Sequence, residues 1–331
     1  MSKHAAKPVF AKNWSSLRAG TRDEARFWPV LVLAACCGLD LLVGNGLSVP
    51  AGVIFWKLRL PRMLTALVAG AALGLTGVQM QAVFRNPLAD PHIMGVSGGA
   101  GLGAAIAALA VTGASLSGGL TLVAAAFAGA LLSGLLIVSV AARVQSTGTL
   151  LLAGVMLGFV LSAVSSVLQY TAGEESLKLF YSWMAGSFSG VRYQGLSLMA
   201  GALMAGCGLA FSQAKSLDLV LFGDAFAIYA GASLRRLRLV TMLGCALMTG
   251  AVTAFCGPIG FAGIAAPHLA RKIWGTSRHK AVLPASMLTG ACLTLLGDML
   301  AHIGPIPLPV GSTLALVGIP LIVWLLWRNR L

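Results

Sequence analysis

Long apolar segments alternate with short polar and charged ones along most of the chain. A helix needs about 20 consecutive apolar residues to cross the hydrocarbon core of a membrane. Ten segments approach that length, at residues 27–46, 62–84, 93–112, 120–141, 148–170, 195–212, 239–256, 258–273, 282–303 and 310–327. The eighth is short and is broken by glycine and proline. The pattern therefore predicts an all-α, polytopic membrane protein with ten transmembrane helices.

Glycine and alanine are frequent in all ten segments. Small residues let transmembrane helices approach closely, because between helices in lipid packing matters more than hydrophobicity. Two groups at helical spacing stand in the second and third segments: Gly70, Gly74 and Gly77, and Gly95, Gly99 and Gly103. We expect these glycines to mark helix contacts.

Composition supports this prediction. The 331 residues are 58% hydrophobic and only 10% charged, whereas soluble domains carry about 25% charged residues. The six cysteines all lie in apolar segments and none forms a CxxC pair, so neither a disulfide framework nor a zinc site is expected. The sequence indicates no catalytic residue, no metal site and no cofactor.

The basic residues predict an orientation. If the N-terminus is cytoplasmic, only five of the 23 Lys and Arg residues fall on the outside, which satisfies the positive-inside rule. Residues 1–26 are then a cytoplasmic tail, residues 27–328 form a single transmembrane domain, and both termini face the cytoplasm. Anionic membrane lipid is a simpler counter-ion for the net charge of +14 than nucleic acid is.

The stretch GPIGFAGIAAPHLARK, residues 257–272, raises the question of a metal site or a helix break. Gly257 and Pro258 are expected to break the chain after the seventh span, and Pro267 to interrupt the eighth. Lys272 stands four residues after His268, where a second metal ligand would be needed. An interfacial histidine is therefore favoured over a metal ligand.

Four stretches together resemble the FecCD family of ABC importer permeases. They are RLPRMLTALVAGAALGLTGVQMQAVFRNPLADPHIMGVSGGAGLGAA from Arg59, LDLVLFGDAFAIYAG from Leu217, the GPIGF stretch, and PLPVGSTLALVGIPLIVWLL from Pro307. The family includes permeases for ferric siderophores, heme and cobalamin. The resemblance implies ten helices in a fold like that of the cobalamin importer permease.

The resemblance also implies partners and a location. Family members act as homodimers in the bacterial inner membrane, with two cytoplasmic ATPase subunits below and a periplasmic binding protein above. The chain contains no GxxxxGK[ST] phosphate loop, so the energy is expected to come from a partner.

The family's ATPase contact corresponds to the loop at residues 213–238, which is the longest basic cytoplasmic loop. By resemblance its middle part couples to the ATPase, and the residues concerned are Leu217, Asp218, Leu221, Gly223, Asp224 and Ala225. The alternative is an ordinary amphipathic helix at the membrane surface.

By the same resemblance, Arg59, Arg62 and His302 dock acidic groups of the binding protein. His302 departs from the family, because an arginine stands there in the cobalamin permease. The two arginines could instead be snorkelling interfacial residues, and Asp298 could hold His302 internally.

The sequence gives weaker evidence for the residues that line the cargo path. Gln79, Gln169, Met199 and Arg192 are candidates, although buried glutamine and methionine also serve ordinary helix packing. Apolar walls favour a broad cargo, with heme first, a ferric siderophore second and cobalamin third. A secondary transporter without an ATPase would need charged relays inside the spans, and Asp40 and Asp298 lie close to predicted span ends.

Overall fold

The computed structural model describes residues 24–43, 52–110, 118–144, 146–304 and 306–328. Most of the predicted tail, residues 1–23, lies outside the described residues. All regular elements in the described part are helices. They are α1 (Glu24–Leu42), α2 (Gly52–Ile54), the π-helix η1 (Phe55–Arg59), α3 (Leu60–Phe84), the 3₁₀-helix η2 (Pro91–Met94), α4 (Val96–Ala110), α5 (Gly118–Arg143), α6 (Thr147–Tyr170), α7 (Glu174–Met184), α8 (Tyr193–Ser212), α9 (Ala214–Val220), α10 (Asp224–Tyr229), α11 (Leu234–Cys256), α12 (Ala262–Trp274), α13 (His279–Ala301) and α14 (Val310–Arg328).

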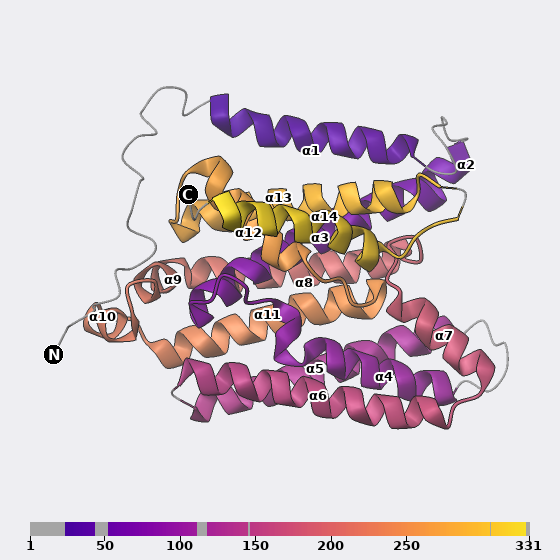
Figure 1. The fold of residues 1–331 in the computed structure, drawn as a ribbon, viewed down its shortest axis with the longest axis horizontal. Helices are drawn as coiled ribbons and strands as arrows, with labels where there is room; N and C mark the ends of the chain where they lie inside the picture. The colour runs from indigo at the N-terminus through magenta and orange to yellow at the C-terminus, as the bar shows by residue number, and fades with distance from the viewer. Residues whose placement is uncertain (1–23, 44–51, 111–117, 145, 305, 329–331) are drawn as a thin grey trace.

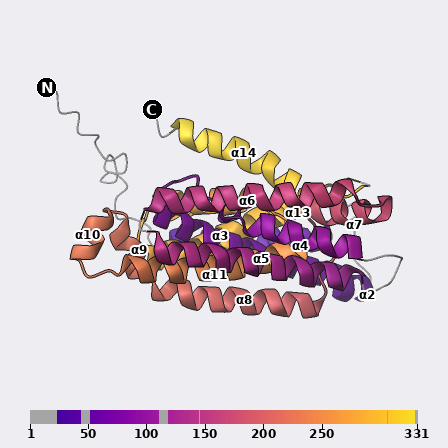
Figure 2. The same cartoon turned by 90° about the horizontal axis from the view of Figure 1, so that it is seen from below.

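The long helices run along one common direction and form a bundle (Figure 1). Helices α4, α5 and α6 form one side, and α3, α12, α13 and α14 form the other. Helix α11 joins the two sides because it packs against both α5 and α3. The short helices α9 and α10 project at one end, here called the α10 end, and α2 and α7 lie toward the opposite α7 end (Figures 1 and 2).

Each of the ten predicted spans contains a helix of the described chain. Six helices are long and apolar enough to cross a membrane, namely α3 with the turns before it, α5, α6, α8, α11 and α13. Three further apolar stretches, in α1, α4 and α14, are shorter. The eighth span corresponds to α12, which has only 13 residues. Membrane crossing by all ten helices therefore remains a prediction.

The predicted glycine contacts are confirmed. A Cβ on Gly70 of α3 would collide with the backbone of Gly290 of α13, and the reverse also holds. Gly99 of α4 and Gly129 of α5 face each other in the same way. Backbone meets backbone at these crossings, as expected where small residues drive helix association.

The chain breaks after α11 as predicted, but Pro267 does not act as expected. Gly257 ends α11 with φ of +76°, and Phe261, just before α12, has φ of +67°. Pro267 lies buried inside α12, and the helix continues through it to Trp274. The prediction of an interruption there is wrong. Pro267 is the sixth residue of α12, so it removes only one backbone donor, the one that would reach the Gly263 carbonyl oxygen near the helix start.

Candidate functional site

The α9–α10 segment, residues 214–229, projects from one end of the bundle (Figure 1). It presents several large apolar side chains to its surroundings. Phe222 is 75% exposed and Tyr229 is 92% exposed. The other large apolar side chains exposed on this segment are Leu221, Phe226 and Ile228. Ala225 is exposed as well. A contiguous stretch of this kind is typical of a surface that contacts a partner.

The inner side of α9 is anchored to the start of α13. Leu217 is fully buried. Asp218 accepts hydrogen bonds from the backbone N–H of His279 at 2.8 Å and from its Nδ1 at 2.7 Å. Burial acts to raise the pKa of the Asp218 carboxyl, but these two bonds, with the charges of His279 and Arg278, outweigh it and lower that pKa.

Helix α10 is anchored through its first residue. The Asp224 carboxylate lies 3.5 Å from Nη2 of Arg85 and accepts a hydrogen bond at 3.2 Å from Nη2 of Arg238. Arg238, at the start of α11, also donates to the Thr147 hydroxyl at 3.0 Å. Gly223 precedes α10 with φ of +112°, a backbone conformation that L side chains rarely adopt. Asp218 and Asp224 therefore point toward the bundle.

The connection between α3 and α4, which begins at Arg85, is tied in turn to the α11–α12 junction. Two histidines make reciprocal contacts between these segments. Nε2 of His268 lies 2.9 Å from the Pro87 carbonyl oxygen, and Nε2 of His92 lies 2.7 Å from the Ile259 carbonyl oxygen. The other ring nitrogen of His92 contacts the Ser97 hydroxyl. His268 is thus a bridging residue, which the sequence did not indicate.

Gln81 adds a third tie between the same regions. Its amide nitrogen donates to the Ile264 carbonyl oxygen at 3.2 Å, and its oxygen accepts from Nη1 of Arg271 at 2.7 Å. The two family-like motifs, far apart in sequence, are therefore one hydrogen-bonded unit next to the base of α10.

The residues predicted to dock a binding protein gather at the α7 end. Nε of Arg62 lies 2.9 Å from Asp298, and its guanidinium also contacts Asp40. Arg59 donates to the Leu41 carbonyl oxygen at 2.7 Å. His302 Nδ1 lies 2.9 Å from the Asp298 carbonyl oxygen, which is the internal alternative considered for it.

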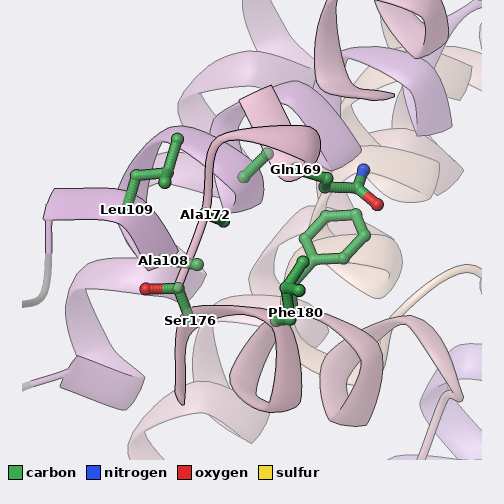
Figure 3. A pocket seen from close by; sticks show the side chains of 8 residues that line it. Ala108, Leu109, Gln169, Ala172, Ser176 and Phe180 are labelled. Atoms are coloured by element: carbon green, nitrogen blue, oxygen red, sulfur yellow. The ribbon is translucent and has the colours of Figure 1, made fainter. Parts of the chain in front are cut away.

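The predicted path residues do not share one lining. Gln79 and Met199 are almost fully buried between helices. Arg192 is exposed just before α8. Gln169 lies beside Phe180 at a small cavity between α4, α6 and α7 (Figure 3). Of the four, Gln169 alone lines this cavity, and the role of all four in transport stays a prediction.

Sequence reasoning missed the partners of the two acids. From the sequence, two of these partners, Arg85 and Arg238, contributed only to the count of basic residues on the cytoplasmic side. Nothing in the sequence pointed to His279 as the third. A signal did exist, because Arg85 and Arg238 flank the predicted spans on the same side as Asp224. Pairing them required the three-dimensional arrangement.

Comparison with known proteins places this geometry in context. The model of the FecCD transport family matches residues 30–328. The vitamin B12 import system permease protein BtuC of Klebsiella pneumoniae is 38% identical over 303 residues, which cover 91% of this chain and 90% of that protein. The protein of the same description from Citrobacter koseri is 37% identical, with 91% of each chain covered.

Two solved structures have a fold similar to that of this chain. A structure described as an inward-facing conformation of a metal-chelate type ABC transporter superposes with a TM-score of 0.83 at 29% identity, covering 92% of this chain and 99% of that one. PsaBC from Streptococcus pneumoniae in complex with Fab has a TM-score of 0.54 at 17% identity and covers 81% and 90%, so it supports the fold alone.

Proposed function

Because the chain belongs to the FecCD transport family, and is an ABC importer permease of that type, we propose that its α9–α10 segment docks a cytoplasmic ATPase subunit that drives transport. One observation carries this proposal. The segment exposes Phe222 and Tyr229 outward while Asp218 and Asp224 anchor it inward. A partner that binds the outer side can therefore push on three bundle helices at once.

The membrane arrangement follows from the same proposal. All ten predicted spans cross the inner membrane, the α10 end faces the cytoplasm and the α7 end faces the periplasm. Residues 27–328 are one permease domain that pairs with a second copy, and a periplasmic binding protein delivers cargo at the α7 end. In the described chain α1 begins and α14 ends toward the α10 end, so these helix ends and the α9–α10 segment share one side, as this arrangement requires (Figures 1 and 2).

The orientation has its own test. Lys215→Cys, near the start of α9, and Glu175→Cys, near the start of α7, each place a thiol at an exposed position. In a cysteine-free background, an impermeant reagent added to spheroplasts should label only the Glu175→Cys variant. Labelling of Lys215→Cys alone would reverse the orientation.

The cargo is a large metal chelate in this proposal. The relatives are named for vitamin B12 import, so we now place cobalamin ahead of heme. Heme was the first choice when only the apolar character of the spans was considered. Heme and ferric siderophores stay as alternatives. Uptake by proteoliposomes that hold the permease, its ATPase and its binding protein, with ATP inside, separates them. Accumulation without ATP would reject the importer mechanism itself.

The docking surface is tested with matched tyrosines. Tyr229 and Tyr170 are 92% and 93% exposed, and Tyr170 ends α6 at the α7 end. Tyrosine is enriched at interface hot spots, where truncation costs about 2 kcal/mol or more, so Tyr229→Ala should weaken ATPase binding by about 30-fold. Tyr170→Ala should leave the ATPase affinity unchanged. Equal affinities for both variants would place the contact elsewhere.

A further inference from the structure

Two carboxyl groups lie buried beside one guanidinium at the α7 end. Asp40 of α1 and Asp298 of α13 have no exposed surface, and Arg62 of α3 is 7% exposed. Arg62 Nε lies 2.9 Å from Oδ2 of Asp298. Its Nη2 lies 3.8 Å from Oδ1 of Asp40, which is an ion-pair contact but too long for a hydrogen bond.

The remaining contacts of the Arg62 guanidinium are with the end of α1. Nη2 of Arg62 donates to the carbonyl oxygens of Asp40 at 3.2 Å and Val43 at 2.9 Å, and Arg59 donates to that of Leu41. In the described part of the chain, the carboxyl oxygens of both aspartates lack a hydrogen bond of good geometry, so the two groups differ only in their distance from Arg62. Asp298 has the close charged contact, and Asp40 does not.

The other groups around the pair leave the charge unbalanced. His302 is the next titratable neighbour. Its Nδ1 lies 2.9 Å from the Asp298 carbonyl oxygen and 3.4 Å from Oδ1 of the Asp298 carboxyl, and its Nε2 lies 3.3 Å from the Ser189 hydroxyl. The neutral form with hydrogen on Nδ1 satisfies these contacts. Cys36, Cys37 and Cys256 interact electrostatically with the pair, but a thiol supplies no positive charge. Two ionised carboxylates against the single guanidinium of Arg62 would leave this group of three side chains with a buried net negative charge.

We propose that the cluster of Asp40, Asp298 and Arg62 is a proton-binding site, in which Asp40 holds a proton while Asp298 stays ionised against Arg62. The bound proton makes the cluster neutral. It also lets the Asp40 carboxyl act as a donor, which relieves a buried carboxyl whose nearest cation, Arg62, lies as far away as 3.8 Å. The site joins α1, α3 and α13, so release of the proton loosens the end of α1.

The first test measures the carboxylic C=O stretch of the purified wild-type permease by infrared difference spectroscopy. A protonated buried carboxyl should give a band that fades reversibly as pH rises from about 5 to about 9. Asp40→Asn should abolish this band. Asp90→Asn is the matched control, because Asp90 is also buried but accepts a hydrogen bond from the His92 backbone, and that variant should retain the band.

The second test measures thermal unfolding against pH. The native chain holds one proton that an unfolded aspartate would have released, so the wild-type Tm should fall as pH rises across this range. Asp40→Asn should flatten that slope and keep the Arg62–Asp298 pair. Asp298→Asn removes the close partner of Arg62 and should lower the Tm more than Asp40→Asn does at about pH 6.

Three results would overturn the proposal. They are the absence of a pH-dependent carboxyl band in the wild type, an unchanged band in Asp40→Asn, and a larger Tm loss in Asp40→Asn than in Asp298→Asn. If Asp40→Asn does not fold, the wild-type titration and the Asp90→Asn control still decide whether a protonated carboxyl is present.

Discussion

The two histidine bridges between the α3–α4 connection and the α11–α12 junction can be tested by isosteric substitution. His268→Phe keeps a ring but removes the donor to the Pro87 carbonyl oxygen, whereas His268→Gln keeps an N–H near the position of Nε2. We expect the Phe variant to be less stable than the wild type and the Gln variant to recover most of the difference.

The size of the effect follows from the surroundings of each carbonyl. A single hydrogen bond contributes about 1 kcal/mol net, and a buried carbonyl left without a donor costs about 1–3 kcal/mol. His268 is half-buried, so water can partly replace it and about 1 kcal/mol is expected. His92 contacts the carbonyl of fully buried Ile259, and His92→Phe should cost about 2 kcal/mol.

The assay is equilibrium unfolding of the purified permease in detergent, followed by tryptophan fluorescence. Because both bridges join the same two segments, the double Phe variant should deviate from additivity by about 0.5 kcal/mol or more. Additive losses would show that the bridges act independently. Equal stability of His268→Gln and His268→Phe would refute the role assigned to the hydrogen bond.

Two further predictions concern packing and pH. Gly99→Ala should destabilise by about 1–3 kcal/mol because its Cβ meets Ser133 and the Gly129 backbone, whereas Gly101→Ala, with open space, should be neutral or slightly stabilising in the same unfolding assay. The pKa of Asp218 is lowered in the folded chain, so its contribution to stability is present above the ordinary aspartate pKa of about 3.9 and lost as pH falls through the lowered value. Asp218→Asn should therefore weaken the dependence of Tm on pH below about pH 4. If that dependence is unchanged, the Asp218 carboxylate does not anchor α9 to α13.

Much of the fold was predictable because lipid imposes a simple length and polarity rule. The apolar segments located a helix in each of the ten spans, and the glycine spacing located helix crossings such as Gly70 with Gly290. Helix α7 was missed. Its 11 residues are amphipathic, with Phe180 buried and Glu174 exposed, and so resemble a polar loop when hydropathy alone is read.

The candidate site was predictable in position but not in orientation. The motif at residues 217–231 identified the segment that projects from the bundle, whereas its acids were assigned to the partner and not to the bundle. One sequence cannot show which way Asp218 and Asp224 point, because that depends on Arg85 just after α3, Arg238 in α11 and His279 at the start of α13. The burial of Arg62 could not be predicted from the sequence for the same reason.

The inward acids have a consequence for how the proposed ATPase contact responds to salt. The outward side chains of α9–α10 include Phe222 and Tyr229, and burying such groups depends weakly on ionic strength. A contact made by Asp218 and Asp224 would instead weaken as salt shortens the screening length from about 10 Å at 0.1 M to about 3 Å at 1 M. We therefore expect the affinity of the reconstituted permease for its ATPase to change by less than about threefold over this range, in a titration at constant detergent. A loss of affinity of about tenfold or more would indicate that Asp218 and Asp224 contact the ATPase.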